Sequence, residues 1–239
     1  MSSESHPLKN ARSLACSDFL AHQNVGKLMQ RLTQATDQQL LDLWNRCNLS
    51  TDAALLAVGG YGRSELFPHS DIDILILLDD ARSKDPHLQS NLESFIALCW
   101  DSGLEIGSAV RTLSECLSEA EQDITVRTSV LEARLLGGHR GLFKLFKRSL
   151  DQAMDPKAFF QAKLLEQQQR HYKFQETPYA LEPNCKESPG GLRDLQIILW
   201  VSKAASLGNS FTDLFKKGLI TERELKELNR NQKLLQNIR

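Results

Sequence analysis

Two aspartates, Asp71 and Asp73, stand at the start of the apolar segment IDILILL (72–78). In an extended strand, residues i and i+2 project from the same face, about 6.6 Å apart at ~3.3 Å per residue. An ionised carboxylate in such a segment is unfavourable unless it is paired or binds a metal. Two converging carboxylates can hold the divalent ions that assist displacement at phosphorus. The spacing therefore predicts that Asp71 and Asp73 are metal ligands and catalytic residues.

A glycine-rich turn, GGYGRS (59–64), precedes these aspartates. Glycines allow a ligand to approach the backbone closely, and they can leave amide N–H groups available to an anion. The turn lacks the last glycine of the dinucleotide-binding pattern GxGxxG, and no GK[ST] follows it, as a P-loop would require. Gly59 and Gly60 are candidates for phosphate binding, and a purely structural turn is the alternative.

The composition is that of an ordinary globular chain. It has 239 residues, of which 41% are hydrophobic and 25% charged, and a formal net charge of −1. That balance disfavours a nucleic-acid partner. Five scattered cysteines with no CxxC pair indicate neither a disulfide framework nor a zinc site, and the longest apolar run, Ile74–Leu78, cannot span a membrane. We expect a cytoplasmic protein without a membrane partner.

Periodicity divides the chain into helical and mixed parts. Apolar runs predict strands at 53–58, 72–78 and 104–110. A helix is expected from about 124 to 136, stopped by Gly137 and Gly138. Four capping-box patterns, each a pair of residues three positions apart, predict the starts of helices. The pairs are Thr36 with Gln39, Ser90 with Glu93, Thr112 with Glu115, and Thr221 with Glu224.

These elements predict an α/β (α+β) fold class. We expect an N-terminal helical segment (1–48), a mixed α/β unit (49–150) and a C-terminal helical domain (151–239). The helical domain begins at an Asp155 cap followed by Pro156, and the loop TPYALEPNCKESPGG (177–191) interrupts it.

The chain carries three separated motifs: GGYGRSELFPHSDIDIL (59–75), LEIGSAVRT (104–112) and EPNCKESPGGLRDLQIILW (182–200). The first resembles the signature of the polymerase-β-like nucleotidyltransferases. Together they resemble the family of bifunctional PII uridylyltransferases/uridylyl-removing enzymes. The resemblance implies a nucleotidyltransferase core with a small mixed sheet. It also implies transfer of UMP from UTP to a tyrosine of the PII signalling protein, with release of pyrophosphate and with Mg²⁺, or Mn²⁺, as the metal.

The resemblance assigns roles to residues of the first motif. Gly59 and Gly60 would hold the triphosphate, and Asp71 and Asp73 would hold the metal. Asp73 or an unidentified third acid would accept the tyrosine proton. Ser70 would donate to a phosphate oxygen or cap the strand. Arg63 would reach the phosphates or pair with Glu65.

The other two motifs offer weaker candidates. The wider superfamily carries a third metal-binding carboxylate on the strand after the helix, where this chain has Glu105 off the expected position; a surface role is the alternative. Lys186 and Arg193 surround two glycines at a helix N-terminus, which favours anions. A second phosphate contact is one interpretation. In the other, Arg193 and Asp194 pair with neighbours and pin the loop.

Proteins of this family continue into an HD-type hydrolase domain and two ACT domains, which this sequence lacks. We therefore expect no uridylyl-removing activity and no direct glutamine response. The sequence stops within a predicted helix, so a face with Leu225, Leu228 and Leu235 is expected to be exposed and to favour self-association. A nucleotidyltransferase with a small-molecule acceptor, and an inactive module that binds nucleotide or a partner, remain as alternatives.

Overall fold

The computed structural model describes residues 7–49, 52–174 and 184–239. The chain forms two compact units, Met1–Gln152 and Ala153–Arg239, and each is described by itself. The division into segments 1–48, 49–150 and 151–239 stays a prediction.

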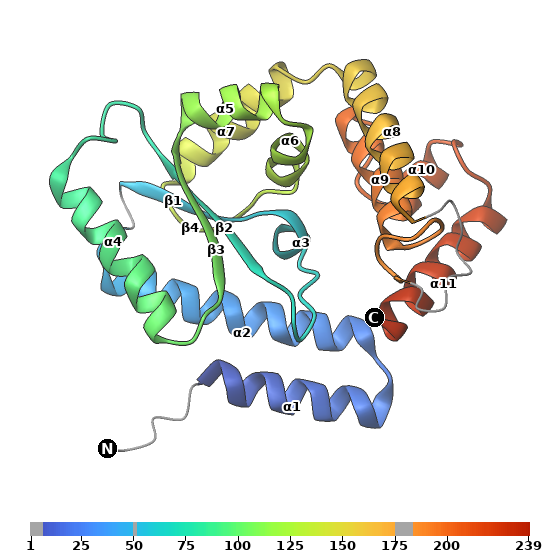
Figure 1. Ribbon diagram of the computed structural model, residues 1–239, viewed down its shortest axis with the longest axis horizontal. Helices are drawn as coiled ribbons and strands as arrows, with labels where there is room; N and C mark the ends of the chain where they lie inside the picture. Colours follow the sequence, from blue (N-terminus) through green and yellow to red (C-terminus); the bar gives the residue numbers. More distant parts are fainter. Residues whose placement is uncertain (1–6, 50–51, 175–183) are drawn as a thin grey trace. The chain divides into compact units, whose positions relative to one another are not determined.

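The first unit is built around a four-stranded mixed sheet with the strand order β3-β2-β1-β4 (Figure 1). Strand β1 (Ala53–Ala57) pairs antiparallel with β2 (Ile72–Leu78) and with β4 (Arg134–Gly138). Strand β3 (Ile106–Thr112) pairs parallel with β2. The α/β class and the small mixed sheet are confirmed, and the third strand begins two residues later than predicted.

Alternation along β2 gives the sheet two apolar faces, because successive strand residues point to opposite sides. Ile72, Ile74 and Ile76 join one hydrophobic cluster with Trp44 and Phe95, whose rings meet edge to face at 5.2 Å. Leu75 and Leu77 belong to a second cluster that also contains Val130 and Phe146. Asp73 therefore lies on the face of the second cluster.

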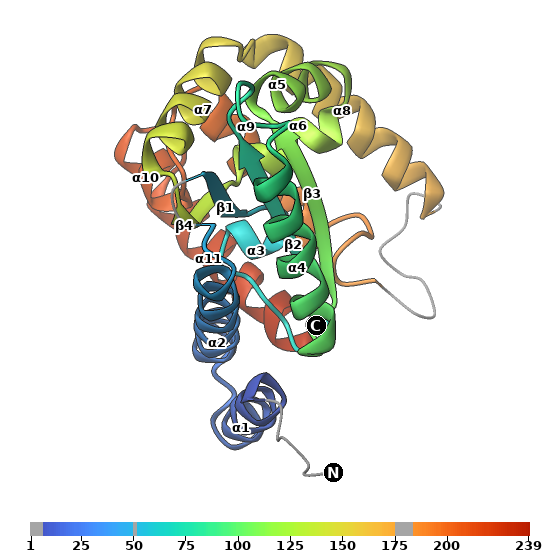
Figure 2. The ribbon, with the colours of Figure 1, turned by 90° about the vertical axis from the view of Figure 1, so that its left-hand side faces the viewer.

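Helices cover both faces of this sheet (Figure 2). The helices of the first unit are α1 (Pro7–His22), α2 (Val25–Arg46), α3 (Gly59–Gly62), α4 (Pro86–Asp101), α5 (Leu113–Gln122), α6 (Ile124–Leu131) and α7 (Arg140–Gln152). Helix α2 supplies Trp44 and α4 supplies Phe95 to the first cluster, while α5, α6 and α7 pack on the second.

Two of the predicted capping boxes in this unit are wrong and one is confirmed. Thr36 lies inside α2, where its hydroxyl donates to the carbonyl of Leu32. Ser90 lies inside α4, because Asp85 caps that helix and Pro86 opens it. Thr112 caps α5, and its hydroxyl and amide exchange hydrogen bonds with Glu115 as predicted.

The predicted helix 124–136 is too long. Helix α6 ends at Leu131, and Arg134–Gly138 form β4 against β1. Gly138 has φ +87°, and a Cβ there would come within 2.1 Å of the backbone oxygen of Ala53. Gly138 therefore permits the close approach of β4 to β1. It lies within a strand and does not end a helix, as the sequence had suggested.

The second unit is helical in its described part, as expected. Its helices are α8 (Pro156–Lys173), α9 (Leu192–Ala204), α10 (Phe211–Lys216) and α11 (Glu222–Ile238). Asp155 caps α8 and Thr221 caps α11 with Glu224, so both predicted starts are confirmed. Residues 177–183 of the predicted loop lie outside the described residues.

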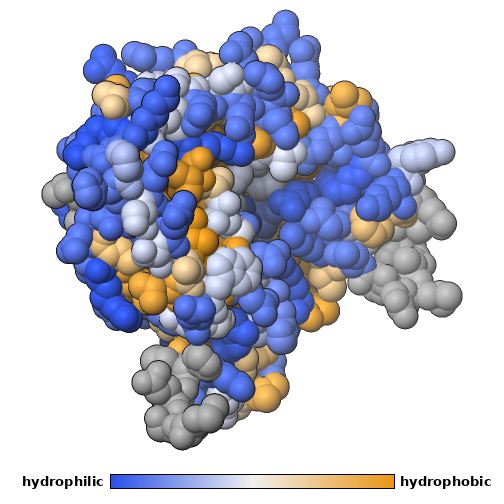
Figure 3. Space-filling view, turned by 60° about the vertical axis from the view of Figure 1, so that its left-hand side comes forward, coloured by the Kyte–Doolittle hydropathy of each residue, from blue (hydrophilic) through white to orange (hydrophobic). Residues whose placement is uncertain are grey.

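The surface is mostly polar on the face shown in Figure 3, where hydrophobic side chains form smaller patches between hydrophilic ones. Among the helices that the structure describes, none combines the length and the apolar character needed to cross a membrane.

Candidate active site

The glycine turn follows β1 directly and forms the short helix α3. Gly59 adopts φ +56°, a conformation that glycine reaches without strain. A Cβ on Gly60 would have its nearest neighbour only at 3.9 Å, whereas a Cβ on Gly62 would lie 2.3 Å from the carbonyl oxygen of Glu132. Gly62 is therefore required by packing. Gly59 and Gly60 lie in the first turn, whose N–H groups have no acceptor within the helix.

The carboxylate of Asp73 lies between two glycines of neighbouring elements. A Cβ on Gly59 would lie 3.5 Å from Oδ2 of Asp73, and a Cβ on Gly107 would lie only 2.7 Å from Oδ1. Gly107 is the residue of β3 that pairs with Asp73 in the parallel ladder. Asp73 itself is half-buried in β2. The structure thus brings Gly59 and Asp73 together as the sequence predicts, and adds Gly107, which the sequence did not single out.

The two other candidate carboxylates flank the strands rather than lying in them. Asp71 is exposed and immediately precedes β2, and Glu105 is exposed and immediately precedes β3. The carbonyl of Glu105 accepts a hydrogen bond of 3.4 Å from the amide of Ile72. Within the described ranges, no three His, Cys, Asp or Glu side chains are grouped so as to hold a metal. The metal roles of Asp71 and Glu105 stay predictions.

A serine of α6 completes this corner of the first unit. Oγ of Ser129 would lie 3.7 Å from the same Cβ position on Gly59 that lies 3.5 Å from Asp73. The sequence offered no signal for Ser129, because it is one hydroxyl within an otherwise unremarkable helical segment, ITVRTSVL. Only the packing of α6 beside α3 brings it to the site.

Ser70 and Arg63 both have local partners. Oγ of Ser70 accepts a hydrogen bond of 3.1 Å from the amide of Phe67, which closes the turn before β2. A hydroxyl that accepts keeps its own proton for donation. Nε of Arg63 lies 2.8 Å from Glu65 and 3.9 Å from Glu132, so the pairing with Glu65 considered from the sequence is present. Nucleotide contacts by Ser70 and Arg63 stay predictions.

A partly buried network that the sequence did not predict holds the glycine turn. The hydroxyl of Tyr61, which is 1% exposed, donates to Asp37 of α2 at 2.6 Å. Arg134 of β4 donates to both oxygens of Asp37 at 2.7 and 3.0 Å and to the carbonyl of Tyr61 at 3.4 Å. Burial, and then the hydrogen bond to Asp37, raise the pKa of Tyr61 far above its ordinary value, so its hydroxyl stays protonated. Residues far apart in sequence thereby anchor α3.

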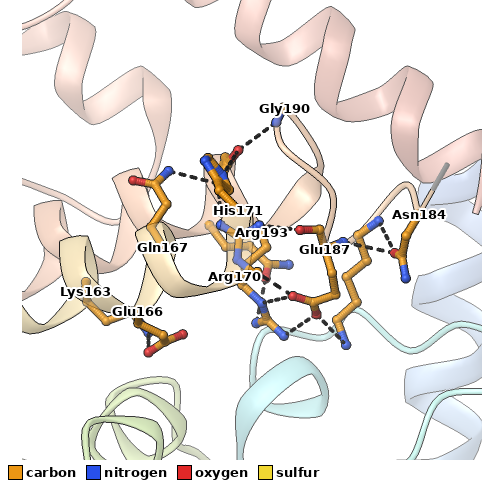
Figure 4. A network of polar contacts seen from close by, with 12 residues as sticks. Lys163, Glu166, Gln167, Arg170, His171, Asn184, Glu187, Gly190 and Arg193 are labelled. Carbon is orange, nitrogen blue, oxygen red and sulfur yellow. Dashed lines mark hydrogen bonds and ion pairs between the residues drawn. The ribbon is translucent and has the colours of Figure 1, made fainter. Parts of the chain in front are cut away.

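In the second unit, Arg193 is engaged in several contacts (Figure 4). Its Nη2 lies 2.9 Å from Glu187, its Nη1 donates to Gln196 at 3.1 Å, and its guanidinium lies 5.3 Å from the ring centre of Trp200. The ammonium of Lys186 lies 3.6 Å from Glu187. Burial, and then the charge of Arg193, lower the pKa of Lys186.

Asp194 is the centre of this network and ties the loop before α9 to α8. It accepts hydrogen bonds from Arg170, from Gln167 at 2.9 Å and from the amide of Gly190 at 2.7 Å, and it lies 3.0 Å from Nε2 of His171. Burial alone would raise its pKa, but these bonds outweigh burial and lower the pKa. Arg193 and Asp194 thus pair with neighbours, as one of the two interpretations expected. Phosphate contacts of Lys186 and Arg193 stay predictions.

Two family models match this chain. Residues 39–132 match the model described as nucleotidyltransferase domain, which includes the glycine turn, both aspartates and Ser129. Residues 158–239 match the model described as GlnD PII-uridylyltransferase.

Curated relatives align with nearly the whole chain. The bifunctional uridylyltransferase/uridylyl-removing enzyme of Cupriavidus pinatubonensis is 56% identical over 97% of this chain and 26% of that protein. Those of Ralstonia nicotianae and Burkholderia thailandensis are each 53% identical, over 97% of this chain and 27% of the relative. The chain thus matches the N-terminal nucleotidyltransferase region of these enzymes. It spans about a quarter of the length of the curated relatives it matches.

Proposed function

We propose that this chain transfers UMP from UTP to a tyrosine hydroxyl of a PII signalling protein. The observation that carries the proposal is the position of Asp73, whose carboxylate lies beside the glycine turn, with Oδ2 3.5 Å from the Cβ position of Gly59. A carboxylate beside a glycine turn combines an anion-binding backbone with an acidic group. The names of the relatives support uridylyl transfer in particular.

In the proposed reaction, the tyrosine oxygen attacks the α-phosphorus of UTP. The new oxygen–phosphorus bond forms as the bond from the α-phosphorus to the bridging oxygen breaks, and pyrophosphate leaves with that electron pair. The proton of the tyrosine hydroxyl passes to a carboxylate, for which Asp73 is the candidate among the described residues. Gly59 and Gly60 hold the triphosphate in place while the bonds change.

The donor set suits Mg²⁺. Magnesium is usually held by one or two carboxylates together with substrate phosphates, so Asp71 and Asp73 suffice without a third acid. The position of the Asp73 carboxylate beside the first turn of α3, 3.5 Å from the Cβ position of Gly59, agrees with such a site. When bound, a divalent ion neutralises phosphate charge and orients the reacting oxygens, and Mn²⁺ could replace it.

The decisive test uses the parent chain and the double variant Asp71→Asn/Asp73→Asn. Each is incubated with a PII protein, Mg²⁺ and one labelled nucleoside triphosphate at a time. We expect label on the PII protein from UTP with the parent chain alone, and none when its tyrosines are replaced by phenylalanine. If label came from another nucleoside triphosphate, that nucleotide would be the donor in place of UTP, and the reaction would still be nucleotidyl transfer.

The two alternatives predict different results. A nucleotidyltransferase for a small-molecule acceptor would bind UTP and release pyrophosphate only with a non-protein acceptor. An inactive module would bind nucleotide without releasing pyrophosphate from any mixture. Absence of both binding and transfer in the folded chain would overturn the proposed function.

Two further properties belong to the same proposal. We expect the protein to act in the cytoplasm, on a protein partner rather than on nucleic acid. Leu225, Leu228 and Leu235 are half-buried along α11 rather than exposed as expected, but α11 has no fully buried residue and Ile238 is 62% exposed. Self-association through this face is expected to appear in light scattering as a mass that rises with protein concentration; a constant monomer mass would contradict it.

A further inference from the structure

We propose that Ser129 is a substrate-contacting residue whose hydroxyl donates a hydrogen bond to a phosphate oxygen of the bound nucleotide. This inference rests on the proposed function. It adds one residue to the site, from a helix that carries none of the predicted site residues. It names α6 as the third wall of the phosphate site, beside the glycine turn and β2.

The hydroxyl of Ser129 lies beside the space in which the phosphate is proposed to bind. Oγ of Ser129 and Oδ2 of Asp73 are both within 4 Å of one point, the position of a Cβ on Gly59, at 3.7 and 3.5 Å. That point holds no side chain, because residue 59 is a glycine with φ +56°. A phosphate held by the amides of the turn and by a metal on Asp73 must occupy the space between these groups. Ser129 borders that space.

The neighbouring hydroxyl of α6 behaves differently. Thr128 is buried and donates its hydroxyl proton to the carbonyl of Ile124 at 2.7 Å, so that proton serves the helix. Ser129 is half-buried, and within the residues that the structure describes its hydroxyl makes no side-chain hydrogen bond. Its proton is therefore available to a ligand, and a hydroxyl can donate to an anion without the desolvation that a second cation would require.

The chemistry also explains why a small neutral donor suits this position. Ser129 lies beside Asp73, which is proposed to hold a metal and to take up a proton. A lysine or arginine here would pair with that carboxylate and compete with the metal. A serine contributes a hydrogen bond to phosphate and leaves the charge of Asp73 unchanged.

The test compares Ser129→Ala and Ser129→Cys with a matched control, Ser94→Ala. Ser94 is an exposed serine of α4, and its hydroxyl donates to the carbonyl of Ser90. Binding of UTP and of uridine is measured by calorimetry on the full chain with Mg²⁺, together with the melting temperature. We expect Ser129→Ala to weaken UTP binding about tenfold, as loss of a hydrogen bond to a charged group should. Uridine binding and the melting temperature should stay unchanged.

The cysteine variant separates donation from packing. Cysteine nearly preserves the size of serine and replaces a strong donor by a weak one, so its UTP affinity should fall between those of the parent and Ser129→Ala. Equal UTP affinity in parent, Ser129→Ala and Ser94→Ala would overturn the role of Ser129. An equal loss for UTP and uridine would also overturn it. A parent chain that does not bind UTP would instead overturn the proposed function.

Discussion

At the scale of single residues, the candidate site depends on two glycines, which have no side chain. Gly59 and Gly107 come from different elements and lie on either side of the Asp73 carboxylate. In the proposed reaction this carboxylate accepts a proton or holds an ion, and a methyl group added on Gly107 would displace it. The backbone also favours glycine at position 59, where φ is +56°, whereas at position 107 only the contact with Asp73 favours it.

Replacing Gly107 by alanine tests this dependence. The added Cβ would lie 2.7 Å from Oδ1 of Asp73 and would force the carboxylate to move. Because a displacement of about 1 Å in a reacting group can lower a rate about 100-fold, we expect a loss of that order in nucleotidyl transfer. Initial rates measured at saturating UTP report it.

The matched control is Gly26→Ala in α2. Its Cβ would meet only Oδ1 of Asn24, at an ordinary 3.6 Å. Alanine in a helix should stabilise the chain by about 0.5–1 kcal/mol and leave the rate unchanged. A Gly107→Ala variant as active as Gly26→Ala would show that Asp73 is not confined as described.

At the scale of elements, the antiparallel contact between β1 and β4 requires glycine at position 138. Gly138→Ala would place a Cβ 2.1 Å from the backbone oxygen of Ala53, at φ +87°. Gly103→Ala is the control, since Gly103 has φ +73° but nothing within 4 Å. We expect the control to lose about 1–2 kcal/mol of unfolding free energy from strain alone. Gly138→Ala should lose at least about 2 kcal/mol more, measured by urea unfolding. Equal losses would contradict the close approach.

The connection between α8 and α9 depends on an ionised Asp194. Its pKa is lower in the folded state than in the unfolded state, so it stabilises the fold at pH values above its unfolded pKa. That contribution disappears as the pH falls through the folded pKa. Asp194→Asn should therefore lower the unfolding free energy by about 2 kcal/mol at pH 7 and flatten its decline below about pH 4.

The control for Asp194 is Asp213→Asn. Asp213 also has a lowered pKa, first through its hydrogen bond with Ser210, but its hydrogen bonds stay within the turn that opens α10 and join no two helices. Its replacement should change the acid dependence much less. Parent and Asp194→Asn curves that run parallel down to pH 2 would exclude the proposed role of the carboxylate.

At the scale of the whole molecule, the first unit contains a complete set of packing partners. Both faces of its sheet are covered by helices of the same unit, and among the residues that the structure describes its two large hydrophobic clusters extend only as far as Leu150. We expect residues 7–152 to fold alone with a single cooperative urea transition, because a domain of this size can bury a sufficient core.

Folding of this fragment is measured by circular dichroism and by the same urea titration as for the full chain. The complementary fragment 153–239 serves as the control, since it should form helix without changing the transition of the first. A broad, non-cooperative transition of 7–152 would show that the two units depend on each other for stability.

The local pattern of the sequence was sufficient for the strands β1 and β2, for the cap of α5 and for the aspartates beside a glycine turn. Each of these depends on neighbours within a few residues: alternation, a capping hydroxyl three positions away, or i and i+2 on one face. It failed where a local signal had two meanings. Gly137 and Gly138 could stop a helix or permit a strand contact, and only the position of β1 decided between them.

The sequence by itself determined the class of fold, the family and the carboxylate that the proposed chemistry requires. The tertiary structure alone decided which side chains surround it. The register of β2 and β3 brings Gly107 opposite Asp73, and the packing of α6 brings Ser129 to the same corner. The network of Asp37, Tyr61 and Arg134 joins three elements. Such contacts join residues far apart in the chain, and no local periodicity encodes them, because the distance between two elements depends on how all the others pack.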